Sequence, residues 1–110
     1  LTKNINSQNG SFIIDDLDSG SPIYGFDITF KLRLGGGSSP PADGMSLSVG
    51  SDVALNSLFG EGGVGSGLRF DWDIFNNPDV PPSPQINLRA GVGGLGTLLP
   101  QGGVGGSRKG

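Results

Sequence analysis

The chain of 110 residues contains no cysteine and no histidine. Without cysteine it has neither disulfide bonds nor thiolate metal sites. Zinc and non-haem iron sites nearly always use histidine or cysteine, so we expect any bound metal to be a hard ion held by oxygen atoms. The absence of histidine also excludes a Ser-His-Asp catalytic triad.

Long apolar runs and basic clusters are missing as well. No run approaches the ~20 apolar residues needed to span a bilayer, and no Lys/Arg cluster is interleaved with aromatic residues as in nucleic-acid binders. Seven basic and ten acidic residues give a net charge of −3. We therefore expect no membrane span and no nucleic-acid partner. The chain begins at Leu1, with neither an initiator Met nor a signal-peptide apolar region, so we expect a processed or excised piece of a longer protein.

Glycine and proline are abundant, with 22 and 8 residues, a level that on composition alone favours low complexity or disorder. Most of these residues lie between runs in which apolar and polar residues alternate. Such runs, separated by Gly/Pro/Asp/Ser segments, are typical of an all-β sandwich or barrel. The predicted strands are FDITFKLRL at 26–34, MSLSV at 45–49, LRFDWDI at 68–74, INLRA at 86–90 and a short SFII at 11–14.

The last twenty residues differ from the rest. Nine of residues 91–110 are glycine, and the few apolar residues among them keep no firm period. Two alternatives fit this composition, a flexible tail or strands packed in an unusual glycine-rich way.

Two segments, PPADGMSLSVGSD at 40–52 and GEGGVGSGLRFDWDIFNN at 60–77, resemble the concanavalin A-like lectin/glucanase superfamily. The likeness extends to the L-type lectins and to lectin-like jelly-roll domains of large secreted bacterial proteins. It implies an antiparallel β-sandwich of the jelly-roll type over residues 1–90. The sandwich would be truncated or incomplete, because a Gly-rich tail at 91–110 stands where the family has further strands.

The same resemblance implies a set of site residues. Carbohydrate would be bound by Asp43, Gly44 and Asn77. Calcium would be held by Asp73, the backbone carbonyl of Phe75, Asn77 and Asp79. Asp71 matches the acid of the neighbouring transition-metal site of legume lectins, where Gln85 replaces the histidine that completes that site.

The carboxylates of the 68–74 strand can also be considered without the resemblance. Residues i and i+2 of a strand share a face about 6.6 Å apart, so Asp71 and Asp73 should project side by side into solvent or towards a loop. A calcium ion takes six to eight oxygen ligands, which this strand and the following loop would supply together. The alternative is that the two aspartates pair with Arg69, Arg33 or Lys31 on a neighbouring strand. Asn77 and Asp79 would then be ordinary turn residues.

A glycosidase is the third possibility for these carboxylates. Retaining enzymes need two carboxyl groups ~5 to 5.5 Å apart, but the β-glucanase signature has a third acid where this chain has Phe75. We therefore expect a protein that is not an enzyme. Asp43 likewise has two interpretations, a ligand for vicinal sugar hydroxyls or the turn residue of an Asp-Gly bend.

Two functions follow from these observations. The first is an extracellular or cell-surface carbohydrate-binding module that recognises a glycan or polysaccharide and is stabilised by calcium. The second is a structural subunit that assembles into a homo-oligomer or filament, because an incomplete sheet presents open edges that invite strands from other copies.

Overall fold

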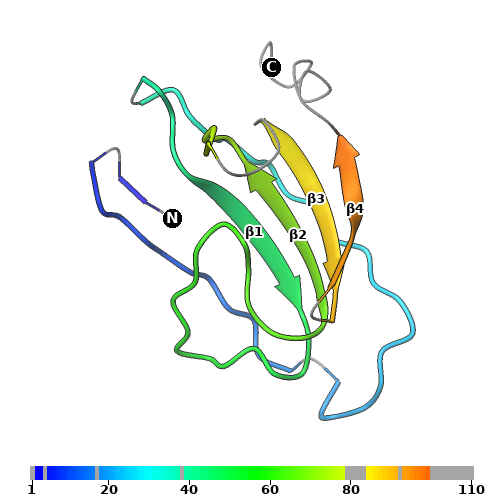
Figure 1. Cartoon of the computed structure of the whole chain (residues 1–110). Coiled ribbons are helices and arrows are strands. Elements are labelled where there is room, and N and C mark those ends of the chain that lie inside the picture. The colour runs from blue at the N-terminus through cyan, green and yellow to red at the C-terminus, as the bar shows by residue number, and fades with distance from the viewer. Residues whose placement is uncertain are drawn as a thin grey trace.

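The computed structural model describes residues 2–3, 5–16, 18–37, 39–78, 84–91 and 93–99. Four strands form one antiparallel sheet in the order β1-β2-β3-β4 (Figure 1). They are β1 (Gly44–Val49), β2 (Leu68–Asp73), β3 (Gln85–Ala90) and β4 (Gly93–Leu99). The described residues form strands and no helix, which confirms the all-β prediction for this part of the chain. The second sheet of a sandwich stays a prediction.

Three predicted strands are found within a residue or so of their expected bounds, as β1, β2 and β3. The fourth strand comes from the glycine-rich segment. Of the two alternatives for residues 91–110, a strand is observed over Gly93–Leu99, where β4 pairs with β3. Residues 100–110 lie outside the described part. Among the described residues no helix has the length and apolar character needed to cross a membrane.

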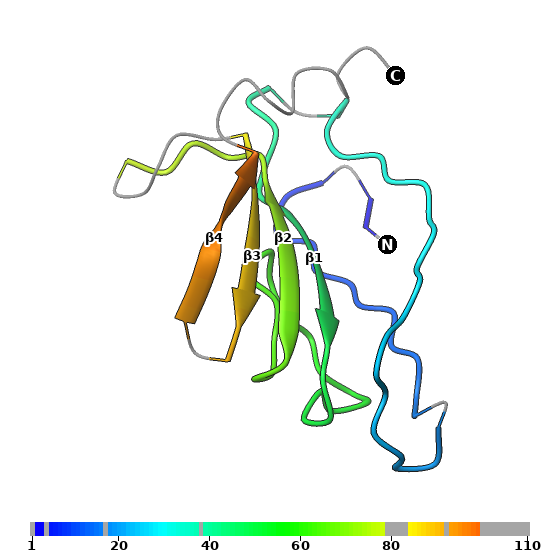
Figure 2. The ribbon, with the colours of Figure 1, turned by 90° about the vertical axis from the view of Figure 1, so that its right-hand side faces the viewer.

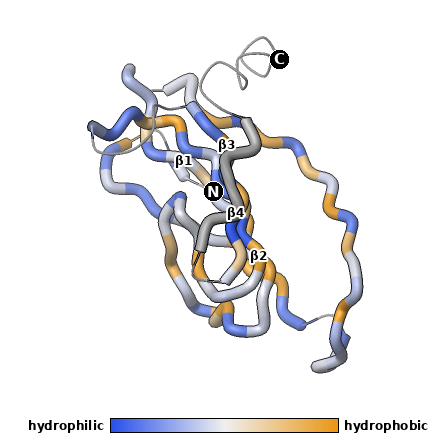
Figure 3. Tube along the Cα trace, turned by 45° about the vertical axis from the view of Figure 1, so that its right-hand side comes forward, coloured by the Kyte–Doolittle hydropathy of each residue, from blue (hydrophilic) through white to orange (hydrophobic). Residues whose placement is uncertain are grey.

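The strongest alternating segment is not a strand. Residues 26–34 and residues 11–14 run outside the sheet without a strand partner, so both strand predictions are wrong. Figures 1 and 2 show the 26–34 segment crossing on one side of the sheet, off its plane, and Figure 3 shows hydrophobic and hydrophilic residues alternating outside the sheet as well as within it. The segment contacts a sheet face through Phe30. The rings of Phe30 and Trp72 pack edge to face, with 6.0 Å between their centroids. Alternation thus decides which side chains turn to the sheet, but a strand also needs a backbone partner.

The register of the sheet sorts its side chains into two faces. Leu47 lies opposite Phe70, which lies opposite Leu88, and these residues belong to the apolar face. One position along, Ser46 lies opposite Asp71, which lies opposite Asn87. This second, polar face consists of Ser46, Ser48, Arg69, Asp71, Asp73, Gln85, Asn87 and Arg89.

In an ordinary sheet the apolar face is the buried one, whereas here the most buried of the described side chains lie on the polar face. Among the described residues outside β4, no hydrophobic side chain is fully buried, whereas Asp71, Gln85 and Asn87 on the polar face are 2, 6 and 9% exposed. Large apolar side chains that remain exposed are Ile5, Phe12, Ile14, Ile23, Tyr24, Phe26, Ile28, Phe30, Leu32, Leu55 and Leu58. The best-packed part of this structure is therefore polar.

The connection between β1 and β2, residues 50–67, folds back on the polar face. Ser46 Oγ donates to the Gly60 carbonyl at 3.0 Å, and the Val64 amide donates to Ser48 Oγ at 3.1 Å. At Gly63, whose φ is +76°, a side chain would come within 2.8 Å of Ser48 Oγ. Glycine is needed there for both reasons, since it alone fits the space and adopts this φ without strain.

Candidate functional site

The candidate site lies where β1 begins and β2 ends (Figure 1). These two strand ends lie side by side at one edge of the sheet, the edge that the ends of the strands form. Gly44 lies opposite Asp73, and the Ile74 amide donates a hydrogen bond to the Asp43 carbonyl at 3.0 Å. The antiparallel pairing therefore brings the two separate groups of predicted site residues together. Asp43 is exposed, so its carboxylate is accessible from solvent at this edge.

The turn at residues 73–77 follows β2 directly. The Phe75 amide donates to Asp73 Oδ1 at 3.0 Å, and Asn77 Nδ2 lies 3.5 Å from the Phe75 carbonyl, at the limit of a hydrogen bond. An aspartate accepting the amide two residues on is an Asx turn. Three of the predicted calcium ligands thus lie in one turn, where they contact each other. The fourth, Asp79, lies outside the described residues.

The fit of this turn to calcium is partial. The described residues contain no group of three or more His, Cys, Asp or Glu side chains that would hold a metal ion. A calcium ion takes six to eight oxygen ligands, and the 73–77 turn supplies the oxygens of Asp73, Phe75 and Asn77. Further ligands would have to come from Asp79 or from water.

Asp71 differs from its expected position. The sequence predicts that it projects into solvent or a loop beside Asp73, and the structure buries it on the polar face, so the predicted exposure is wrong. Asp71 Oδ2 accepts a hydrogen bond from Asn87 Nδ2 at 2.7 Å, and Oδ1 accepts one from Arg89 Nε at 2.8 Å. The partners predicted for an ion pair were Arg69, Arg33 and Lys31. The observed partner, Arg89, comes instead from β3, the strand with which β2 pairs.

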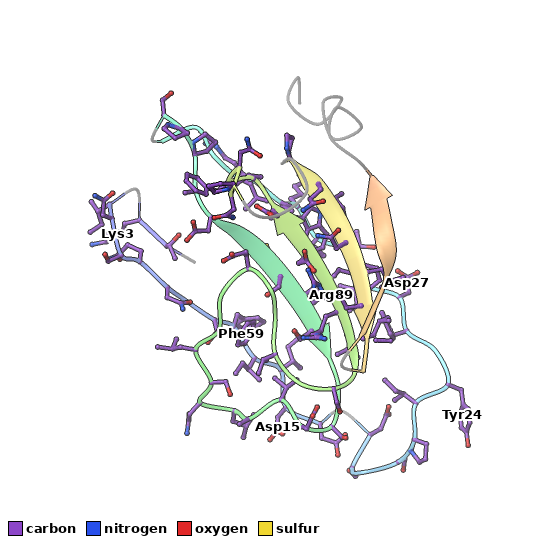
Figure 4. All side chains as sticks on the ribbon, in the orientation of Figure 1. Lys3, Asp15, Tyr24, Asp27, Phe59 and Arg89 are labelled. Carbon is purple, nitrogen blue, oxygen red and sulfur yellow. The ribbon has the colours of Figure 1, made fainter. Side chains whose placement is uncertain are left out.

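The buried carboxylate of Asp71 links β2 to β3 through its hydrogen bonds to Asn87 and Arg89. Burial of a carboxylate is unfavourable unless it is paired and hydrogen-bonded, and Asp71 is both. Arg89 is only partly covered, with 42% of its side chain exposed (Figure 4). The neighbouring Arg69 donates from Nη2 to the Gly91 carbonyl at 2.8 Å, while its buried Nε has no partner in the described part of the chain. The arrangement of Asp71 is that of a structural anchor.

The glycine-rich connection approaches the same edge. A side chain at Gly44 would collide with the Trp72 carbonyl oxygen and would lie 3.0 Å from Glu61 Cβ. Glu61 is therefore a neighbour of the start of β1 that the sequence did not assign to the site. The signal in the sequence is that the single Glu of the chain stands among glycines. The glycine loop thus comes close to β1 at two places, at Gly63 beside Ser48 and at Glu61 beside Gly44.

Tyr24 and Phe75 are two aromatic side chains that differ in their position relative to the candidate site. Tyr24 is 99% exposed, but it lies in a loop at the far end of the molecule from the start of β1 (Figure 4). Phe75, in the 73–77 turn, is the aromatic residue of the site and is half-buried. Stacking of a sugar ring at this edge would rely on Phe75.

Comparisons of the chain with family models, with curated proteins and with solved structures found no match. The resemblance to the concanavalin A-like superfamily therefore stays a prediction from the motifs in residues 40–52 and 60–77.

Proposed function

We propose that this chain is a lectin-like carbohydrate-binding module that acts at the cell surface or outside the cell. The observation that carries the proposal is the meeting of Asp43 and Gly44 with the 73–77 turn at one edge of the sheet. Asp43 and Asn77 lie far apart in the sequence, yet both belong to the ligand set that the resemblance implies. In this proposal the sheet β1 to β4 is one layer of a concanavalin A-like jelly roll.

The chemistry of the edge suits sugar hydroxyls. The exposed Asp43 carboxylate would accept hydrogen bonds from two vicinal hydroxyls, and charge-assisted bonds of this kind are stronger than neutral ones. In the glycine loop the amides of Gly63, Val64 and Ser66 donate internally. The amides of Glu61 and Gly62, nearer to Gly44, form no hydrogen bond within the described residues and would serve as donors to the sugar.

In this proposal calcium stabilises the 73–77 turn and does not contact the sugar. Bound at Asp73, the Phe75 carbonyl, Asn77 and Asp79, it would fix the turn that presents Asn77. Asp71 is not among these ligands, because both of its oxygens are already used by β3.

Glycan retention on polysaccharide columns tests the proposal, with Asp43→Ala and Asn77→Ala as the site variants. We expect either variant to abolish retention while the unfolding transition stays unchanged. Asp27→Ala is the control, since Asp27 is equally exposed but lies on the 26–34 segment (Figure 4). Retention that persists in both site variants would contradict sugar binding at this edge.

A second candidate, self-assembly with copies of the chain, is favoured by a different observation. Outside β4, the described residues include no fully buried hydrophobic side chain, and the exposed apolar residues among them are concentrated in and before the unpaired 26–34 segment. β1 is an edge strand, so one row of its backbone groups is open to another strand. The occupant we propose is the 26–34 segment of a second copy, whose strand-like alternation suits addition to β1.

Light scattering tests assembly with a matched pair of variants. Phe26→Lys with Ile28→Lys places two charges on the apolar side of the segment, and Asp27→Lys with Thr29→Lys places them on its polar side. We expect a wild-type mass well above 11.2 kDa, reduced to that value by the first pair and retained by the second. A wild-type monomer of 11.2 kDa would contradict assembly.

A further inference from the structure

A cavity of about 340 Å³ adjoins the candidate site. One wall comes from Ala42, Gly44 and Ile74, the residues on either side of Asp43 and its hydrogen-bond partner. Lys3, Arg33 and the three glycines at 35–37 also line the cavity. The volume lies within the ~300 to 1,000 Å³ typical of small-ligand pockets, so it is large enough for one sugar ring.

The charged residues of this cavity are both cations. Lys3 and Arg33 line it without an acidic residue among the lining side chains, in a chain whose net charge is −3. Within the described residues neither of them forms an ion pair, and both are exposed. Arg89, in contrast, is held by Asp71. Two cations, with no carboxylate among the described residues that line the cavity, create a local positive potential that favours an anionic ligand.

The glycines beside Arg33 add backbone donors. Gly35 and Gly36 have φ values of +79° and +82°, and a side chain at Gly36 would lie 3.2 Å from Arg33 Nη2. Their small size therefore lets the guanidinium lie across the loop. The amides of Gly35, Gly36 and Gly37 form no hydrogen bond within the described part of the chain, so they remain available as donors alongside the two cations.

We propose that this cavity binds the carboxylate of an acidic saccharide, with the uronate group between Lys3 and Arg33. The planar guanidinium matches a carboxylate through two parallel hydrogen bonds. The inference rests on the proposed sugar binding at Asp43. The hydroxyls of the sugar are bound at Asp43, and its carboxylate enters the cavity whose wall Ala42 and Gly44 form. The module is thereby selective for uronate-containing polysaccharides over neutral ones.

Calorimetric titration with three probes tests this selectivity. The probes are a galacturonate tetrasaccharide, the same tetrasaccharide with its carboxyl groups reduced to alcohols, and a sulfated galactose tetrasaccharide. We expect wild-type protein to bind the uronate at least about tenfold more tightly than the neutral probe at low salt. Arg33→Gln and Lys3→Gln should each reduce that preference. Lys31→Gln should retain it, because Lys31 is an exposed cation on the same segment that does not line the cavity.

The outcomes separate this inference from the function on which it rests. Equal binding of the uronate and neutral probes, unchanged by Arg33→Gln, overturns the anion site and leaves sugar binding intact. Uronate binding that needs Arg33 but not Asp43 supports the cavity and contradicts the proposed role of Asp43. Preference for the sulfated probe overturns the carboxylate assignment. Failure to bind any of the three probes overturns the uronate assignment, and retention on polysaccharide columns then decides sugar binding at Asp43 separately. Circular dichroism of each variant shows that it remains folded.

Discussion

The β1 to β3 sheet and the 26–34 segment have the same alternating pattern but different structures. Both place apolar residues at every second position, and in the segment the alternation is longer and more regular. The sheet residues pair, whereas the segment lies against a face and exposes nearly half of Phe26, Ile28 and Phe30. Alternation is therefore insufficient to make a strand in this chain.

The two regions differ in the contacts that join them to neighbouring strands. In the sheet, Asp71 is hydrogen-bonded across to Asn87 and Arg89, and Gly67 lets the backbones of β1 and β2 come close. The 26–34 segment has a single ring contact, between Phe30 and Trp72, with the sheet. Specific cross-strand contacts thus select the partner and the register. Four predictions test this difference, beginning with the largest expected effect.

Removal of the buried carboxylate should destabilise the chain most. Asp71→Ala removes the carboxylate that accepts hydrogen bonds from Asn87 Nδ2 and Arg89 Nε. We expect a loss of ~2 to 3 kcal/mol in the free energy of unfolding, below the ~3 to 5 kcal/mol of a fully buried pair because Arg89 is partly exposed. Urea denaturation measures the loss. Asp27→Ala, on the 26–34 segment, should change stability by less than ~0.5 kcal/mol. Equal effects of the two substitutions would contradict the anchoring role of Asp71.

A methyl group at Gly67 should push the start of β2 away from the end of β1. The added Cβ would collide with the Val49 carbonyl oxygen and lie 2.8 Å from Gly50 Cα, so the backbone must shift. We expect Gly67→Ala to cost ~1 to 3 kcal/mol of unfolding free energy, as overpacking does elsewhere. Gly25→Ala is the matched control beside the 26–34 segment, where nothing lies within 4 Å. The comparison fails if the control destabilises the chain as much as Gly67→Ala.

The contact between the two regions should have a smaller energy. Phe30 and Trp72 meet at an interplanar angle of 84°, an edge-to-face geometry. A double-mutant cycle of Phe30→Ala and Trp72→Ala should give a coupling energy of ~0.5 to 1.5 kcal/mol. A coupling energy of zero would mean that the segment does not dock on the sheet face.

The smallest effect concerns pH and the 50–67 connection. Backbone and side-chain hydrogen bonds from Ser66 lower the pKa of Asp52 below its ordinary value of 3.8. A carboxyl group whose pKa is lowered by folding contributes stability above the unfolded-state pKa, and this contribution is lost as the pH falls through the folded-state pKa. We expect Asp52→Asn to remove part of the acid dependence of the unfolding free energy below pH 3.8. An identical acid dependence in the variant and in wild type would show that this hydrogen bond is not formed in solution.

Much of the sheet could be predicted from the sequence. Alternation located β1, β2 and β3 and placed Asp71 and Asp73 on one face of β2, in agreement with the register. The burial of Asp71 could not be predicted, because it depends on Asn87 and Arg89 of β3 lying beside it. β4 was undecided, since glycine gives no alternation of side chains from which a strand can be recognised.

The candidate site could be predicted only in part. The motifs placed Asp43, Gly44 and the 73–77 turn in one site, and antiparallel pairing brings them to one edge. Glu61 was missed because its contact with Gly44 depends on how a glycine-rich loop folds. The cavity of Lys3 and Arg33 was missed for the same reason, since it joins residues from three separate segments.

The most direct test of the difference between the two regions is residue-resolved amide hydrogen exchange on the dilute, free chain. We predict slow exchange for β2 and β3, which have a hydrogen-bonded neighbour on both sides, and fast exchange throughout residues 26–34. Protection of residues 26–34 equal to that of Phe70 and Leu88 would show that the segment is a paired strand. That result would contradict the conclusion that cross-strand anchors, rather than alternation, decide which segments join the sheet.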